Sequence, residues 1–128
     1  EHEDPRSINS LGRCYQNGKG VEQSFQKAFD LYKRAADLGS PYAMNNLGKC
    51  YECGFGCDRD YNIASQLYQK AAELGESYGF NNLALMYEKG LGVNQNITKA
   101  IELYHAAIDI GNPDAHSNLK NLQKKSKK

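Results

Sequence analysis

Three of the four cysteines lie close together in the chain, where thiols can bind a metal or form a disulfide. Cys50, Cys53 and Cys57 make a C-x2-C-x3-C pattern, and two cysteines so spaced are typical of half of a zinc site. A fourth ligand is missing from the pattern, and the histidines lie in other segments, at His2, His105 and His116. A zinc site is therefore disfavoured, and a disulfide between Cys53 and Cys57 is a further alternative.

The glycine-rich and nucleophilic residues form no recognisable catalytic or nucleotide site either. Gly18-Lys19-Gly20 contains paired glycines, but phosphate and dinucleotide loops follow a β-strand, and no run of alternating apolar and polar residues predicts one here. Nucleophilic catalysis needs a cysteine or serine beside a base and an orienting group. Because the sequence brings no such set together, we predict that the protein is not an enzyme and binds no cofactor or metal.

Charge and hydropathy narrow the classes of partner. The chain has 16 Lys+Arg against 15 Asp+Glu, a net charge of +1, which argues against a strongly basic nucleic-acid surface. Four of the positive charges lie in the last five residues, at Lys124, Lys125, Lys127 and Lys128. No apolar run approaches the roughly 18 residues of a membrane span. We therefore expect neither nucleic acid nor membrane as a partner.

Most of the chain consists of three copies of one sequence. Residues 5–40, 41–76 and 77–112 align without a gap, and a partial fourth copy begins at Pro113. The recurring positions include Leu11/Leu47/Leu83, Tyr15/Tyr51/Tyr87, Gly18/Gly54/Gly90, Tyr32/Tyr68/Tyr104 and Gly39/Gly75/Gly111. Such a period is typical of a solenoid, in which each copy packs against its neighbours.

Each copy carries the signals of two helices. In its second half, apolar residues recur every three or four positions, as from Phe25 to Leu38, which predicts an amphipathic helix. Good N-cap residues precede this helix, at Ser24, Asp60 and Asn96. Glycines suited to a left-handed helix end follow it, at Gly39, Gly75 and Gly111. All three prolines then stand just after a capping residue, so the next helix begins after a two-residue connection.

These signals predict an all-α fold. We expect a right-handed αα-superhelix (solenoid) of three 36-residue helix-turn-helix repeats plus a C-terminal capping helix, as a single domain over residues 1–128. The capping helix is expected at 113–124 and a basic tail at 125–128. Lys120 and Gln123 there replace the glycine and tyrosine that a following helix would need, so the array is expected to end at this helix.

The repeat also gives the cysteines a simpler interpretation. Cys14 and Cys50 occupy the repeat position of Met86, and Cys57 occupies the position of Val21 and Val93. These three cysteines are therefore expected to pack as small apolar side chains. Unpaired thiols slightly favour a reducing intracellular compartment, although the sequence does not identify the compartment.

The repeat resembles the Sel1-like repeat (SLR) family, which is related to tetratricopeptide repeats. In the second copy the resemblance rests on the run 43–51, on Gly54-Phe55-Gly56, on Lys70-Ala71-Ala72 and on Gly75; the third copy matches through Asn82-Leu83 and Gly90-Leu91-Gly92-Val93, among others. It extends over essentially the whole chain. The resemblance implies an αα-superhelix that serves as an adaptor or scaffold in protein complexes, without a shared catalytic residue.

By analogy with tetratricopeptide grooves, one set of side chains is expected on the concave face. These are Arg6, Asn9, Arg13, Tyr42, Asn45, Lys49, Tyr78, Asn81 and Leu85. The asparagines could hydrogen-bond both the N–H and C=O groups of an extended peptide. The basic residues suit acidic side chains or a C-terminal carboxylate, and the tyrosines supply contact area. In the alternative interpretation, the asparagines only hold the turns between repeats.

We therefore predict a non-catalytic scaffold or adaptor module that binds a peptide or partner protein in this groove and is monomeric in isolation. A structural spacer or regulatory segment of a larger protein is the alternative. The partner itself is not encoded in any feature of the sequence.

Overall fold

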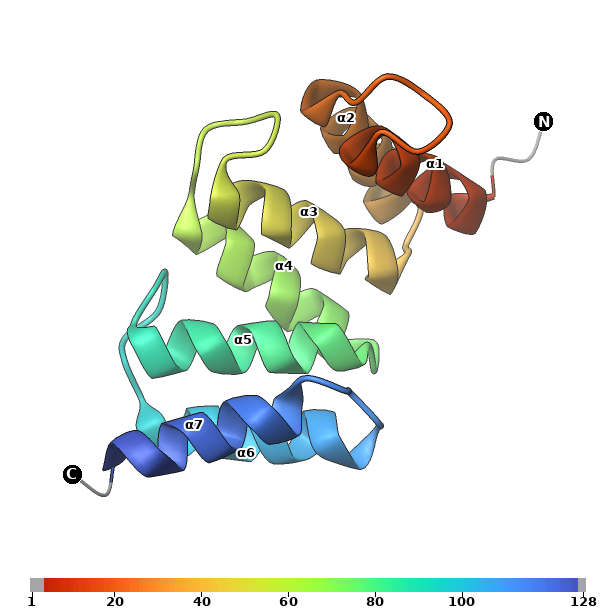
Figure 1. Ribbon diagram of the computed structural model, residues 1–128. Helices are drawn as coiled ribbons and strands as arrows, with labels where there is room; N and C mark the ends of the chain where they lie inside the picture. Colours follow the sequence, from red (N-terminus) through yellow and green to blue (C-terminus); the bar gives the residue numbers. More distant parts are fainter. Residues whose placement is uncertain (1–3, 127–128) are drawn as a thin grey trace.

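The computed structural model describes residues 4–126 and contains seven α-helices (Figure 1). They are α1 (Pro5–Asn17), α2 (Phe25–Asp37), α3 (Pro41–Cys53), α4 (Tyr61–Glu73), α5 (Ser77–Lys89), α6 (Ile97–Asp109) and α7 (Ala115–Ser126). No strand occurs between residues 4 and 126. Consecutive helices pack against one another along the array, so the predicted all-α solenoid is confirmed.

The helix ends lie where the capping residues predict them. Ser24, Asp60 and Asn96 each accept a hydrogen bond from the backbone N–H three residues later, at 3.2, 3.1 and 3.0 Å. The first helix of each repeat ends at a left-handed glycine, Gly18, Gly54 or Gly90. Because these signals recur in each copy, all six helices of the repeats have the same length of 13 residues.

Each helical hairpin closes around one buried tyrosine. Tyr68 is fully buried, and a Cβ added at Gly48 would lie 2.7 Å from its ring, so only glycine allows α3 and α4 to approach this closely. The Tyr68 hydroxyl donates a 2.6 Å hydrogen bond to Glu52 on α3. Burial raises the pKa of this hydroxyl far above its usual value, which keeps it a donor. Tyr32 and Tyr104 make the equivalent bonds in the other two hairpins.

Neighbouring repeats are joined through the loop between the two helices of a hairpin. Phe55 in the second loop stacks on Phe25 at the start of α2, with 4.6 Å between ring centroids. Gly56 approaches the backbone of Phe25 so closely that a Cβ would overlap it. The first loop has no earlier repeat to contact in the described chain, and the space around Gly20 is open.

The ends of the array differ from its interior, and the cap differs from its predicted boundaries at 113 and 124. Leu11 is 44% exposed, whereas its counterparts Leu47 and Leu83 are 6% and 1% exposed, because no described helix packs on that side of α1. The capping helix begins at Ala115, since Pro113 and Asp114 form a turn instead of its first helical residues.

The helix also extends beyond the predicted boundary at 124. It continues to Ser126 and includes Lys125, whose ammonium lies 3.4 Å from the Glu88 carboxylate. Lys125 is therefore part of the helix, although 69% of its side chain is exposed. Lys127 and Lys128 lie outside the described residues, as does His2. None of the described helices is long and apolar enough to cross a membrane.

Candidate functional site: a concave groove

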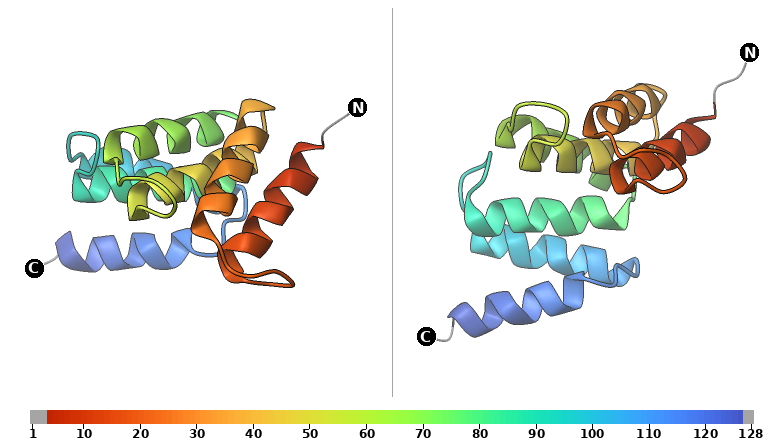
Figure 2. Two further views of the ribbon diagram at one scale, coloured as in Figure 1. Left: turned by 90° about the horizontal axis from the view of Figure 1, so that it is seen from above. Right: turned by 45° about the horizontal axis from the view of Figure 1, so that its top comes forward.

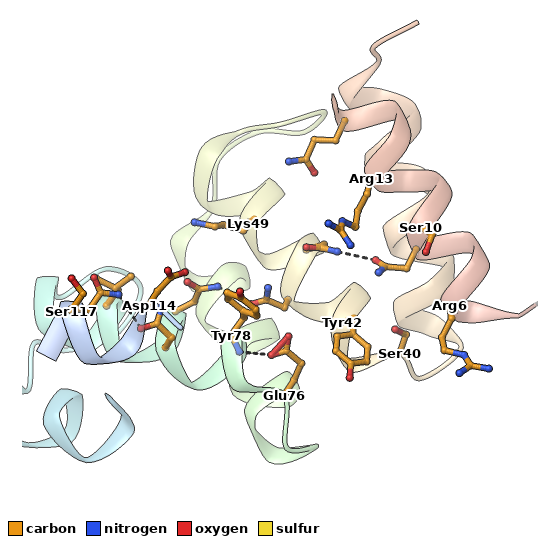
Figure 3. A pocket seen from close by; sticks show the side chains of 18 residues that line it. Arg6, Ser10, Arg13, Ser40, Tyr42, Lys49, Glu76, Tyr78, Asp114 and Ser117 are labelled. Atoms are coloured by element: carbon orange, nitrogen blue, oxygen red, sulfur yellow. Dashed lines mark hydrogen bonds between the residues drawn. The ribbon is translucent and has the colours of Figure 1, made fainter. Parts of the chain in front are cut away.

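The first helices of the repeats and the capping helix together line a groove of about 830 Å³ (Figure 3). Helix α3 lies between α1 and α5 and contacts both (Figure 2). Residues 36 positions apart on these helices therefore line the groove in rows. All nine side chains predicted for the concave face line this groove: Arg6, Asn9, Arg13, Tyr42, Asn45, Lys49, Tyr78, Asn81 and Leu85.

The groove extends one helix further than the predicted set. Asp114, in the turn before α7, and Ser117, in its first turn, also line it, and they occupy the repeat positions of Tyr78 and Asn81. The 36-residue period, continued into the partial fourth copy, was the signal that identifies them. Two of the predicted rows therefore have four members, and the row of Arg13, Lys49 and Leu85 has three.

The asparagines form a ladder in which each rung ties two repeats together. Asn9, Asn45 and Asn81 each accept, at Oδ1, a hydrogen bond from the Nδ2 group of an asparagine in the next helix of the row. The donors are Asn46, Asn82 and Asn118, at 2.9, 2.8 and 3.0 Å. The interpretation that these asparagines hold adjacent repeats is therefore correct for their carbonyl oxygens.

The other half of each amide remains available to the groove. The Nδ2 groups of Asn9, Asn45 and Asn81 donate no hydrogen bond to any residue between 4 and 126. Every fully buried side-chain nitrogen or oxygen in that part of the chain has a partner, so these three Nδ2 groups must reach solvent. Each of these Oδ1 atoms keeps a second lone pair, and the Oδ1 atoms of the donor asparagines accept no hydrogen bond within residues 4–126, so the ladder offers acceptors as well as donors. Their use by a peptide stays a prediction.

The charged side chains of the groove differ in whether they form an ion pair, and its tyrosines are exposed. Arg13 and Lys49 are exposed and form no ion pair within residues 4–126, and both extend into the groove (Figure 3). Arg6 lies at the edge, 3.8 Å from Asp4. The rings of Tyr42 and Tyr78 are 58% and 39% exposed, unusually high for aromatic residues.

Glu76 lines the groove but is committed to the backbone. Its carboxylate caps α5 by accepting hydrogen bonds from the N–H groups of Tyr78 and Gly79. Burial raises the pKa of this carboxyl, and the two backbone hydrogen bonds partly oppose that increase. Only 6% of the residue is exposed, so it offers little charge to a ligand.

The cysteines pack as the repeat predicts. Cys50 is buried in the core formed by α2 and α3, and Cys57 packs against the same cluster. Burial raises the pKa of the Cys50 thiol to about 12, so it stays protonated and unreactive. Cys53 is exposed, and all four thiols are unpaired. Among residues 4–126, no three histidine, cysteine or acidic side chains converge as metal ligands.

The repeat positions also match a known family model. The Sel1 repeat model matches residues 5–40, 41–76 and 81–112, which is most of the chain and all three copies. The chain belongs to the Sel1 repeat family. The third match begins four residues after the predicted boundary at 77, where Ser77 and Gly79 replace the proline and alanine of the second copy.

Solved structures of Sel1 repeat proteins resemble the fold closely. A Sel1 repeat protein from Oxalobacter formigenes is 30% identical, with a TM-score of 0.83 over 91% of this chain and 46% of its own. The protective antigen c5321 of uropathogenic Escherichia coli, which has an SLR fold, is 32% identical, with a TM-score of 0.81 over 96% of this chain and 26% of its own.

A third similar structure is nearly the same length. Cysteine-rich protein B of Helicobacter pylori is 27% identical, with a TM-score of 0.74 over 90% of this chain and 89% of its own. The chain thus spans less than half of the first two proteins and most of the third. Comparison with curated proteins finds no significant match. Sel1 repeat proteins are generally scaffolds for protein interactions and are typically not enzymes.

Proposed function

We propose that the concave groove binds an extended segment of a partner protein. The observation that carries this proposal is the row of three Nδ2 groups, on Asn9, Asn45 and Asn81, that donate no hydrogen bond within residues 4–126 while the Oδ1 of the same amide is held by the next repeat. Unused donors at regular spacing suit the carbonyl oxygens of a polypeptide backbone that is not folded on itself.

The geometry favours such a ligand in two further ways. The inter-repeat hydrogen bonds hold the Asn Oδ1 atoms in place, so the amide donors are oriented before a ligand arrives, which lowers the entropy cost of binding. Tyr42 and Tyr78 add two exposed rings from adjacent repeats, and tyrosine combines apolar contact area with a hydrogen-bonding hydroxyl. The resulting site recognises main chain and side chains together.

A random library of short peptides panned against the whole chain tests the proposal. The peptides recovered are expected to lose affinity about thirtyfold when Tyr42→Ala and Tyr78→Ala are combined, because each ring contributes on the order of 1 kcal/mol. The matched control combines Leu38→Ala and Leu74→Ala, which remove exposed apolar side chains outside the groove. Peptides that bind equally well to the groove variant would contradict the proposal and favour the spacer alternative.

A further inference from the structure

Charge is distributed unevenly along the groove. The row of residues that begins with Arg6 continues with Tyr42 and Tyr78 and ends with Asp114, so it passes from a cation through two aromatic rings to an anion. The row beginning with Arg13 continues with Lys49 and then Leu85, so it passes from two cations to an aliphatic side chain. Both rows are thus positive at the α1–α3 end of the groove.

The positive end has unused binding capacity. Arg13 and Lys49 come from neighbouring repeats, extend into the same groove and have no acidic partner within the described chain. Arg6 pairs with Asp4 and is partly neutralised. The free Nδ2 groups of Asn9 and Asn45 lie in the same two helices and add neutral donors. Such a set of donors without an acceptor suits a carboxylate.

The opposite end has a different character. Leu85 occupies the position of the two cations and packs against the core of the third hairpin, so it offers an apolar contact. Asp114 is exposed on the turn before α7. Glu76 does not add to it, because its carboxylate caps α5. An acidic group on a ligand is therefore attracted to one end only, and a basic group is attracted to the other.

We infer that the groove binds its peptide in one orientation, with a carboxylate at Arg13 and Lys49, an apolar side chain at Leu85 and a basic group at Asp114. This inference rests on the proposed function and specifies its ligand. The carboxylate belongs either to an acidic side chain or to the C-terminus of the peptide, and both present the same two oxygens to the arginine and lysine. Electrostatic complementarity of this kind fixes the orientation and selects the partner.

Synthetic peptides matching the library sequences distinguish the two sources. One series exchanges glutamate for glutamine, and the other replaces the free C-terminus by an amide. Affinity is expected to fall about tenfold in the series that removes the bound carboxylate. This loss should become smaller at higher salt, because salt screens the attraction between the carboxylate and the two cations. If neither change lowers affinity, the inference is wrong.

Charge reversal in the protein tests the orientation. The double variant Arg13→Glu/Lys49→Glu is expected to lose the preference for acidic peptides and to gain affinity for basic ones. Asp114→Lys is expected to weaken only peptides with a basic group at the other end. The matched control is Lys33→Glu/Lys70→Glu, which makes the same charge change on exposed sites of α2 and α4. Helical circular dichroism checks that each variant folds.

The failure of this inference is distinguishable from failure of the proposed function. If the charge-reversed variant keeps the wild-type preference while the Tyr42→Ala/Tyr78→Ala variant still loses affinity, the groove binds peptide but the charge assignment is overturned. If binding is insensitive to both variants, the groove proposal falls as well.

Discussion

The side-chain oxygen of Asn45 accepts a 2.8 Å hydrogen bond from the Nδ2 group of Asn82, which lies 37 residues later. Both side chains are largely buried, and the same pairing recurs between Asn9 and Asn46 and between Asn81 and Asn118. In each of these groove-lining asparagines the oxygen links two repeats, while the nitrogen donates no hydrogen bond within residues 4–126. Stability and the proposed recognition are coupled through a single row of amides.

Removing one donor from this ladder should weaken the array. Asn82→Ala leaves the buried Oδ1 of Asn45 without its partner, which is expected to cost about 1–3 kcal/mol in the free energy of unfolding. Ser10→Ala is the matched control, because Ser10 occupies the same repeat position but is exposed and makes no such bond. Urea denaturation measures both; equal stability for the two variants would contradict the role given to the ladder.

The buried leucine of the second repeat offers a second test. Leu47→Ala is expected to lower the free energy of unfolding by about 2–5 kcal/mol, because it creates a cavity between α2 and α3. Leu11→Ala removes the equivalent side chain where it is 44% exposed and should cost much less. Calorimetry of the two variants that found similar losses would show that the register of the repeats is wrong.

Comparing two glycines separates the effect of the contact between a loop and the neighbouring repeat from the effect of backbone strain. Gly20 and Gly92 have nearly the same left-handed φ, 77° and 72°, so an alanine is strained by the backbone to a similar degree at both. A Cβ at Gly92 would also overlap the backbone of Tyr61, whereas the space around Gly20 is open. Gly92→Ala should therefore destabilise the protein more than Gly20→Ala does. Thermal unfolding that ranks them the other way would refute the close approach.

The pH dependence of stability should report on Glu76. Burial raises the pKa of its carboxyl in the folded protein, so the folded state holds the proton more tightly than the unfolded chain does. The contribution of Glu76 to stability therefore falls as pH rises from the ordinary glutamate pKa through the raised folded value. The reference variant is Glu76→Ser, because serine already caps α3 at the equivalent position, Ser40. The free energy of unfolding of wild type should fall relative to that of the variant as pH rises through this window. A difference that grows in favour of wild type with rising pH would contradict the shift.

The caps and glycines explain why the helices could be predicted from sequence. Ser24 and Gly54 cap helix ends through backbone groups only a few residues away, so a short stretch of sequence is enough to predict these ends. Residues with the same capping roles recur at equivalent positions of the other repeats. The positions of the groove residues came from the analogy with tetratricopeptide grooves, and the period carried each position from one repeat to the next. The binding role of those rows stays a prediction.

Other features depend on contacts that no local pattern encodes. The orientation of the Asn45 amide is set by Asn82 in the next repeat, so the sequence around Asn45 alone does not show that its Oδ1 is engaged while its Nδ2 is not. The cap was predicted to end at 124, but α7 continues to Ser126, and within it Lys125 contacts Glu88 of α5, which lies 37 residues earlier. Leu11 repeats the pattern of a core residue but lacks a neighbouring helix to bury it.

The most direct test of the groove follows the asparagine side-chain amides by NMR while the tightest peptide from the library is titrated into the whole chain. The side-chain NH2 signals of Asn45 and Asn81 are expected to shift on binding, whereas those of Asn62 and Asn94, exposed outside the groove, should stay unchanged. Shifts confined to residues outside the groove, with Asn45 and Asn81 unaffected at saturation, would contradict the account.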